Sequence, residues 1–450
     1  MKITTKHKKS LNILFLDVYK KSWSRISKDT AGGYGTENDL GDSFFGRLIS
    51  FIIKQFIFWP NLSFAQLMQE LKSYGHKVLY KKHTGLYNYK GNWDVIFVCG
   101  SIVCFETEIA NIINIKKKKK IPIFYCGTFP KYSLDKIPKS VTVLSGNYEF
   151  FLQKVIAEKV DILNFIKERI IHFSDGDSDS LSQIDWKKNG LPKTKNLILG
   201  KSSNYFPFIS SRGCPYTCRE YCTYPTSQGI KVNRQNNFET IKKLKIISRD
   251  SPGSHVIFRD PVFSLNIKET KSLLNLIYKE NLDLQFSAEL HLKNIDDDFI
   301  ELCKKAKFSG LKFGIESAIP DVRDSVNRFS VSNDIQKNMI DKINNAGLKT
   351  IGMFILAQPM DTFDTCMETI KYACSLNLSV AQFSIFTPYP GTPFFISNQN
   401  LIDEGHYENF NQYNLVYKHK EFTKKQARKL LELAYRKFII SKLMKKVKFS

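Results

Sequence analysis

Short apolar runs of strand length alternate with helix-length segments along the first 170 residues of this 450-residue chain. Apolar runs of four to eight residues are typical of strands buried on both faces of a parallel sheet. We predict strands over residues 11–17, 76–80, 93–100 and 121–127, and helices over 64–74 and 105–115. Such alternation predicts right-handed βαβ units, and hence a Rossmann-like parallel-sheet domain that binds ligands at the carboxyl ends of its strands.

A second series of β/α units begins near residue 197. Its predicted strands, each followed by a more polar helical segment, cover residues 205–210, 255–263, 284–290, 310–317, 350–359 and 381–386. Beyond residue 394 the pattern changes, and residues 423–447 carry apolar positions at helical spacing with a basic outer face. The class is therefore α/β, with a helical C-terminal extension.

The composition shifts between the two series, where residues 173–180 are acidic, small and polar. Such a stretch is typical of a flexible linker. We therefore predict a Rossmann-like domain over residues 1–172, a linker over 173–196, a barrel domain over 197–395 and a basic helical extension over 396–450.

The chain is strongly basic, with 67 Lys and Arg against 43 Asp and Glu and a formal charge of +24. This charge invites a nucleic-acid partner. The lysines are scattered along the whole length, however, so nucleic acid is disfavoured as the substrate.

No apolar run reaches the roughly 20 residues that cross a bilayer, so we expect no transmembrane segment. The nearest run, residues 44–59, is interrupted by Arg47 and Lys54 and predicts an amphipathic or buried helix, with peripheral membrane contact as a minor alternative. The nine cysteines and the absence of a signal-peptide pattern at the start predict a reducing, cytoplasmic location.

Three of those cysteines, Cys214, Cys218 and Cys222, lie within nine residues of a Gly/Pro-containing loop that follows a predicted strand. Clustered thiolates select zinc, copper(I) or an iron–sulfur cluster. A structural zinc site usually has four protein ligands, and no companion Cys or His pair follows at the spacing of a zinc finger. These residues therefore predict a [4Fe-4S] cluster held at three irons, with the fourth iron open.

The loop resembles that of the radical S-adenosylmethionine (SAM) superfamily, and in particular of members with an N-terminal cobalamin-binding-type domain. The shared elements are Arg-Gly-Cys-Pro-Tyr at 212–216, Gly-Ile-Glu-Ser at 314–317 and Pro-Tyr-Pro-Gly-Thr at 388–392. The family signature is CxxxCxxC, whereas this chain reads CxxxCxxxC. The extra residue leaves two alternatives, a bulged loop that still delivers three thiolates or a degenerated cluster site.

The resemblance implies a partial (β/α)6 barrel of TIM type that binds SAM and cleaves it to a 5′-deoxyadenosyl radical. Strand-end residues of such a barrel line its site. The residues that the resemblance and this placement predict to bind the cofactor are Tyr221, Asp260, Glu289, Glu316, Ser317, Arg328 and Gln358. The alternative for the carboxylates is that they cap the helices that follow. No catalytic residue is assigned.

The first domain resembles the cobalamin-binding domain of the family through its loop Gly32-Gly33-Tyr34-Gly35. The DxHxxG motif, which supplies an axial histidine to cobalt, is absent, because no histidine follows Asp17. Cobalamin binding therefore stays open. With it, we expect a methyltransferase acting on an unactivated centre of a small molecule, lipid or peptide.

Without cobalamin, the alternatives are a non-methylating oxidoreductase or rearrangement enzyme, or a degenerate barrel that serves as a scaffold or nucleic-acid-binding protein. An active enzyme would also need a one-electron reductant such as flavodoxin or ferredoxin.

Overall fold

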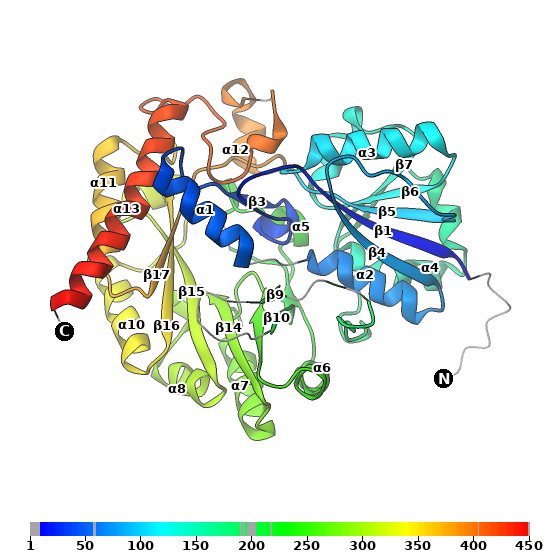
Figure 1. Cartoon of the computed structure of the whole chain (residues 1–450). Helices are drawn as coiled ribbons and strands as arrows, with labels where there is room; N and C mark the ends of the chain where they lie inside the picture. Colours follow the sequence, from blue (N-terminus) through cyan, green and yellow to red (C-terminus); the bar gives the residue numbers. More distant parts are fainter. Residues whose placement is uncertain are drawn as a thin grey trace. The chain divides into compact units, whose positions relative to one another are not determined.

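A computed structural model describes residues 10–56, 60–189, 191, 194–195, 204–216, 218–403 and 405–448. The chain divides into two compact units, each built on its own parallel sheet (Figure 1). The first unit comprises Met1–Ser22, Ile26–Thr36 and Trp59–Lys193, and the second comprises Trp23–Arg25, Glu37–Phe58 and Thr194–Ser450. The predicted domain boundaries stay predictions, and the expected junction of linker and barrel at residues 196 and 197 lies outside the described residues.

The sheet of the first unit has six strands in the order β4-β1-β5-β6-β7-β8, all parallel. Its strands are β1 (Asn12–Tyr19), β4 (Lys77–Thr84), β5 (Val95–Cys99), β6 (Ile123–Cys126), β7 (Val141–Gly146) and β8 (Ile170–Phe173). The central strands β5, β6 and β7 are buried throughout, which is why they are apolar without alternation. The Rossmann-like sheet expected from the sequence is confirmed, with β7 and β8 in addition to the four predicted strands.

Helices cover both faces of this sheet. Helix α3 (Phe105–Lys118) lies on one side, and α2 (Leu62–Ser73) packs with α4 (Phe151–Glu158) on the other (Figure 1). The side chain of Asn61 caps α2 by accepting a hydrogen bond from the backbone N–H of Phe64. The parallel βαβ arrangement therefore follows the alternation in the sequence.

The larger sheet of the second unit has the order β17-β16-β15-β14-β13-β10-β9, and only β9 is antiparallel to its neighbour among the described strands. Its strands are β9 (Thr194–Lys195), β10 (Asn204–Phe208), β13 (Ser254–Phe258), β14 (Leu284–Leu290), β15 (Phe308–Glu316), β16 (Lys349–Leu356) and β17 (Val380–Ile385). Six consecutive parallel strands form the curved half-barrel, so the partial (β/α)6 barrel is confirmed. Two small two-stranded sheets pair β2 (Arg25–Ser27) with β3 (Thr36–Asn38), and β11 (Ser211–Arg212) with β12 (Asn233–Arg234).

Helices line the outer face of the half-barrel (Figure 1). They are α6 (Asn237–Asp250), α7 (Ile267–Glu280), α8 (Asp297–Lys305), α10 (Asn333–Asn345) and α11 (Phe363–Ser375). The short helices α5 (Tyr224–Gln228) and α12 (Pro393–Ser397) pack against the Cys218–Glu220 turn, and α9 (Pro320–Ser325) follows β15. Buried residues of the strands alternate with partly exposed ones, as in β16 and β17. The buried set faces these helices, and the partly exposed set faces the concave side.

Two further helices complete the second unit. Helix α13 (Lys424–Lys448) packs against β17 and α11, and it is the C-terminal helix expected from the sequence. Helix α1 (Phe44–Phe56) covers most of the predicted segment 44–59, whose last three residues lie outside the described part. None of the helices in the described residues is both long and apolar enough to cross a membrane.

Candidate functional site

The three predicted thiol ligands lie in a loop at the carboxyl end of β10, where a short helical turn accommodates the longer second spacing. Residues Cys218–Glu220 form a 3₁₀ turn, and the backbone N–H of Cys222 donates to the carbonyl oxygen of Cys218 at 3.1 Å. Residues four apart in a helical turn share a face. The extra residue thus leaves Cys218 and Cys222 on the same side of the loop.

The thiols differ in how readily they ionise. The hydrogen bond that the Cys222 thiol donates, together with the charge of Arg328, lowers the pKa of Cys218 to about 6 against the opposing effect of burial. Burial raises the pKa of Cys214 to about 11. The thiolate is the form that binds metal. The lowered pKa therefore favours the metal-binding form of Cys218.

A buried carboxylate holds the start of the loop in place. Asp260, which follows β13, accepts hydrogen bonds from the backbone N–H of Ser210 at 2.7 Å and from the hydroxyls of Ser210 and Ser211 at 2.6 and 2.7 Å. Gly213 has φ +83°, and a β-carbon there would lie 2.0 Å from the carbonyl oxygen of Lys231. Asp260 therefore positions the cysteine loop, and its contact with a cofactor stays a prediction.

Arg328 connects this loop to the end of β15. Its Nη1 donates to Sγ of Cys218 at 3.8 Å, and its Nη2 donates to the carbonyl oxygen of Gly314 at 2.9 Å. Its Nε lies 3.6 Å from Oε1 of Glu316. Burial raises the pKa of Glu316, although the guanidinium opposes this shift. Two predicted cofactor residues and one predicted metal ligand therefore form one buried cluster.

The backbone at the end of β15 is specialised for that cluster. Glu316 has φ +68°, an uncommon conformation for a residue with a side chain. A β-carbon on Gly314 would lie 2.3 Å from Oε1 of Glu316 and 2.9 Å from Nη2 of Arg328. The glycine of the Gly-Ile-Glu-Ser element thus leaves the room that the ion pair occupies.

Three predicted cofactor residues carry buried polar atoms that make no hydrogen bond of ordinary geometry within the described part of the chain, although Tyr221 and Arg328 both lie close to the Glu316 carboxylate. They are the hydroxyl of Tyr221, Nε of Arg328 and Oε1 of Gln358. Burying such an atom without a partner costs about 1–3 kcal/mol. Such atoms also occur elsewhere in the described residues, among them atoms of Tyr89 and Ser254, so a polar ligand at the three candidates stays a prediction.

Ser317, by contrast, is engaged by the protein. Its hydroxyl pairs with that of Thr369 on α11 at 3.1 Å and accepts from the backbone N–H of Ile319 at 3.1 Å. The structure therefore places Ser317 against a helix of the outer layer, and its predicted cofactor role stays a prediction.

Glu289, at the end of β14, lies between two cations that the sequence analysis did not single out. Arg259 Nη1 and Lys312 Nζ each lie 3.0 Å from Oε1 of Glu289. Burial raises the pKa of Glu289, but Lys312 and Arg259 outweigh that effect and lower it to about 2. The local signal for Lys312 is a charged residue within a mainly apolar strand, two residues before Gly314. Its pairing in register with Glu289 is visible only in the sheet.

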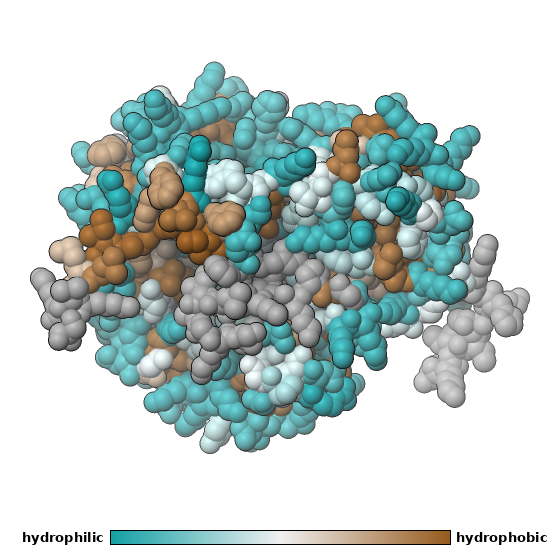
Figure 2. Space-filling model, viewed as in Figure 1, coloured by the Kyte–Doolittle hydropathy of each residue, from teal (hydrophilic) through white to brown (hydrophobic). Residues whose placement is uncertain are grey.

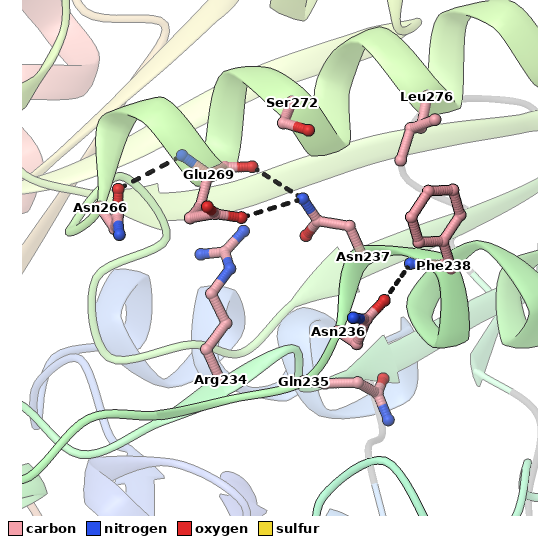
Figure 3. Close-up of a pocket in the computed structure, with 9 residues that line it drawn as sticks. All are labelled: Arg234, Gln235, Asn236, Asn237, Phe238, Asn266, Glu269, Ser272 and Leu276. Carbon is pink, nitrogen blue, oxygen red and sulfur yellow. Dashed lines mark hydrogen bonds between the residues drawn. The ribbon is translucent and has the colours of Figure 1, made fainter.

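A pocket of about 480 Å³ lies in the second unit, between the N-terminal ends of α6 and α7 (Figure 3). Arg234 points toward Glu269, and Asn237 donates to the carbonyl and the carboxylate of Glu269 at 3.1 and 3.4 Å (Figure 3). The lining consists of Arg234, Gln235, Asn236, Asn237, Phe238, Asn266, Glu269, Ser272 and Leu276. None of the predicted site residues is among them, so this pocket is distinct from the cysteine site.

The donor set fits an iron–sulfur cluster rather than a single ion. Within the described residues, no three His, Cys, Asp or Glu side chains are gathered closely enough to hold one metal ion. A [4Fe-4S] cluster takes thiolates on separate irons. Three cysteines of one loop, with Cys218 and Cys222 on the same side of it, are the kind of donor set that such a cluster uses.

The first unit gathers charged groups at the carboxyl ends of β1 and β5. Lys28 Nζ lies 3.1 Å from Oδ1 of Asp17 and 2.7 Å from Oε1 of Glu108, and it donates to the carbonyl oxygen of Cys99 at 2.9 Å. The hydroxyl of Tyr125 donates to Oε2 of Glu108 at 2.5 Å. Asp17 stands where the first residue of the absent DxHxxG motif would be. Its carboxylate is part of a fully buried ion cluster.

The glycine loop lies at the same edge. Ala31, Gly32, Gly33 and Gly35 all have positive φ, and Thr128 after β6 donates to the carbonyl oxygen of Gly32 at 3.3 Å. A β-carbon on Gly33 would meet only the hydroxyl of Thr128, at 3.7 Å. The loop therefore leaves open backbone where a ligand of a Rossmann-like domain approaches.

Comparison with known proteins agrees with this geometry. Residues 208–373 match the family model of the radical SAM superfamily. The chain therefore carries a radical SAM domain, which confirms the superfamily expected from the sequence. The matched segment begins at the end of β10 and contains the three cysteines, Glu316 and Arg328.

Two curated relatives are methyltransferases by name. The chain is 30% identical over 238 residues to an uncharacterized methyltransferase of Pyrococcus horikoshii, covering 52% of this chain and 50% of that protein. It is 24% identical over 267 residues to the bacteriochlorophyllide d C-8(2)-methyltransferase of Chlorobaculum tepidum, covering 57% and 58%. The chain thus spans only half to three-fifths of the length of these relatives.

Two solved structures share the fold across both units. TsrM from Kitasatospora setae, solved with cobalamin and a [4Fe-4S] cluster, matches with a TM-score of 0.62 at 14% identity and covers 86% of this chain and 78% of that one. OxsB, solved with aqua-cobalamin and SAM, matches with a TM-score of 0.63 at 14% identity and covers 94% and 66%. The first unit therefore has the fold of the cobalamin-binding-type domain.

Proposed function

We propose that this protein is a radical SAM enzyme in which Cys214, Cys218 and Cys222 hold a [4Fe-4S] cluster. The observation that carries the proposal is the contact of Arg328 with both Cys218 and the Gly314–Glu316 segment. It joins the thiol loop to a second strand end of the half-barrel. Parallel strands present their carboxyl ends at one edge, where such barrels carry their chemistry.

SAM would bind beside the cluster, in contact with Tyr221, Arg328 and Gln358. When both are bound, the cluster supplies the electron that cleaves the S–C5′ bond of SAM to methionine and a 5′-deoxyadenosyl radical. Tyr221, Arg328 and Gln358 would offer a hydroxyl, an N–H and a side-chain carbonyl oxygen to the cofactor. Glu316 adds a buried carboxylate, while Glu289 remains ionised between its two cations.

We propose further that the reaction is a cobalamin-dependent methyl transfer to an unactivated centre of a small molecule, lipid or peptide. The methyltransferase names of the relatives and the fold of the first unit support this subclass. Cobalamin, when bound, would supply the methyl group. The reduced cluster calls for a one-electron donor such as flavodoxin or ferredoxin, and for a cytoplasmic location.

The runner-up is a radical SAM oxidoreductase or rearrangement enzyme that acts without cobalamin. It is favoured by the buried cluster around Asp17, where Lys28 and Tyr80 contact the carboxylate and no histidine follows. Binding of cobalamin decides between the two.

Anaerobic reconstitution with iron and sulfide tests the first proposal. We expect a brown protein that binds about four irons per chain and forms 5′-deoxyadenosine from SAM under reductant. Cys218→Ala should lose iron and turnover, whereas Cys374→Ala, a partly exposed cysteine on α11, should retain both. If Cys218→Ala keeps its iron, Cys218 is not a ligand and the proposed site is wrong. If the unaltered protein binds no iron, the chain is a degenerate barrel acting as a scaffold or binding protein.

Tyr221→Phe separates SAM binding from cluster binding. It removes only a hydroxyl that lies beside the Glu316 carboxylate, so the iron content should stay the same and the unfolding midpoint should change little. The Kd for SAM should increase about tenfold, because the variant lacks the hydrogen bond from the Tyr221 hydroxyl to SAM. An unchanged Kd would remove Tyr221 from the site.

Incubation with hydroxocobalamin, followed by gel filtration, tests the methyl-transfer proposal. We expect a retained corrin spectrum in the protein fraction, independent of the iron cluster. If no corrin is retained while SAM is still cleaved, the methyl-transfer proposal fails and the runner-up stands.

A further inference from the structure

Helix α1 presents an unusual apolar stripe to solvent. Phe44, Leu48, Phe51 and Ile52 recur at the i, i+4, i+7 and i+8 positions of one helical face, and Phe44 and Phe51 are 83% and 52% exposed. The opposite side of the helix carries Gly46 and Ser50, which are buried. An amphipathic helix normally buries its apolar stripe. In α1 this stripe instead faces solvent, and small residues face the protein.

The last turns of α13 add to this surface. The buried side chains of the helix, among them Leu431 and Phe438, face the half-barrel. Ile440, Leu443 and Met444 project outward on the other side and are exposed. Brown side chains gather over α1 and this end of α13 on one face of the molecule (Figure 2).

Ion pairs fix the N-terminal end of α1 to α13. Arg428 on α13 lies 2.9 Å from the carboxylates of both Asp39 and Asp42, just before α1 begins. Glu432 accepts a hydrogen bond from the backbone N–H of Ser43 at 3.4 Å. The two apolar stripes therefore belong to one surface of the second unit, which we call the α1/α13 face.

Positive charges predominate around the α1/α13 face, where the exposed carboxylate of Asp42 is paired with Arg428. Arg47 and Lys54 flank the stripe of α1, and Arg436 and Lys437 are exposed on α13. Neither α1 nor residues 434–448 contain an Asp or Glu. A protein partner of average surface would present both signs, whereas anionic lipid presents only negative charge to these cations.

We infer that the α1/α13 face docks the protein on a membrane surface rich in anionic lipids. The apolar side chains enter the boundary between headgroups and acyl chains, and the arginines and lysines contact the headgroup phosphates, which is how interfacial amphipathic helices bind. At 13 residues, α1 is too short to span a bilayer, so it lies in the plane of the surface. A surface role places the half-barrel beside lipids or lipid-borne molecules, and it stands independently of the cofactor proposals.

Sedimentation of the full-length protein with vesicles tests this inference. We expect binding to vesicles of equimolar phosphatidylcholine and phosphatidylglycerol, little binding to phosphatidylcholine alone, and weaker binding as salt is raised. The double variant Leu48→Asp with Phe51→Asp should lower the partition coefficient at least about tenfold. Arg47→Gln with Lys54→Gln should lower it about tenfold on anionic vesicles and leave the weak binding to neutral vesicles unchanged.

Ile335→Asp on α10 is the matched control, because Ile335 is 51% exposed but lies outside the α1/α13 face. It should bind vesicles as the unaltered protein does, and circular dichroism should show all variants folded, since the replaced side chains are exposed. Absent binding to anionic vesicles, or equal loss in the control, overturns the inference. So does a dimer in solution that Leu48→Asp with Phe51→Asp dissociates, because the face would then join two copies of the chain.

Discussion

Arg328 donates a hydrogen bond from Nη1 to the thiol of Cys218 at 3.8 Å, across 110 positions of sequence. The same guanidinium pairs with Glu316 at 3.6 Å. The cysteine loop and the Gly-Ile-Glu-Ser element are therefore electrostatically coupled before any cofactor binds. This coupling has consequences for stability that can be measured.

Replacing Arg328 by Gln should leave the Glu316 carboxylate buried without its cation. Removing one member of a buried ion pair typically costs about 3 kcal/mol. We expect Arg328→Gln to lower the free energy of unfolding by about that amount, and Arg328→Gln with Glu316→Gln to recover much of it. Urea unfolding of the wild type, both single variants and the double variant measures the coupling. Additive losses would mean that the pair is not coupled.

Glu289 should make the stability of the second unit depend on pH. Its pKa falls from 4.5 to about 2 in the folded chain. A lowered folded-state pKa means that the ionised side chain stabilises the fold above the unfolded-state value of about 4.5, and that this contribution is lost as the pH falls toward 2. Its size is at most about 3 kcal/mol.

The measurement compares Glu289→Gln with the wild type in urea unfolding between pH 7 and pH 3. The stability difference should be constant above about pH 5 and shrink below about pH 4.5. A difference that stays constant down to pH 3 would contradict the ionised state of Glu289.

Gly314→Ala should disturb the Glu316–Arg328 pair through the added methyl group alone. The new β-carbon would lie 2.3 Å from Oε1 of Glu316, so the side chains must move apart. We expect a loss of about 1–3 kcal/mol in unfolding free energy and reduced SAM binding. Gly405→Ala is the control, since its nearest neighbour would be 3.5 Å away. Equal effects of the two substitutions would contradict the crowding argument.

The spacing of the second and third cysteines should be required for the cluster. Deleting Arg219 restores CxxxCxxC but removes the turn in which the Cys222 N–H bonds to the Cys218 carbonyl. The deletion variant should bind clearly less iron after reconstitution, whereas Arg219→Ala, which keeps the spacing, should bind as much as the wild type. Iron assay and visible absorbance give the answer. Full iron binding by the deletion variant would show that the extra residue between Cys218 and Cys222 is not needed for cluster binding.

Lys28→Met should destabilise the first unit. Asp17 and Glu108 would face each other without a cation in a site that excludes water. A loss of about 3 kcal/mol is expected, seen as a lower unfolding midpoint. Lys120→Met, at an exposed position, should leave the midpoint unchanged. If Lys28→Met is equally neutral, the buried ion cluster does not stabilise the unit.

Local sequence pattern determined much of this protein. Apolar runs between helical segments predicted the six parallel strands of the half-barrel and four of the six strands of the first sheet, because side-chain periodicity reflects which faces of an element are buried. The cysteine loop was equally visible, since three thiols within nine residues remain neighbours in any fold.

Only the tertiary structure decided how those pieces are used. Sheet register set Lys312 beside Glu289, and the packing of the half-barrel brought Arg328 to Cys218. Asp260 and Glu316 both lie at the ends of apolar strands, yet Asp260 binds the serines before the cysteine loop and Glu316 pairs with Arg328. The pairing of Arg428 with Asp39 likewise ties the segment before α1 to the C-terminal helix. Contacts between residues far apart in sequence depend on strand order and packing, which no local pattern encodes.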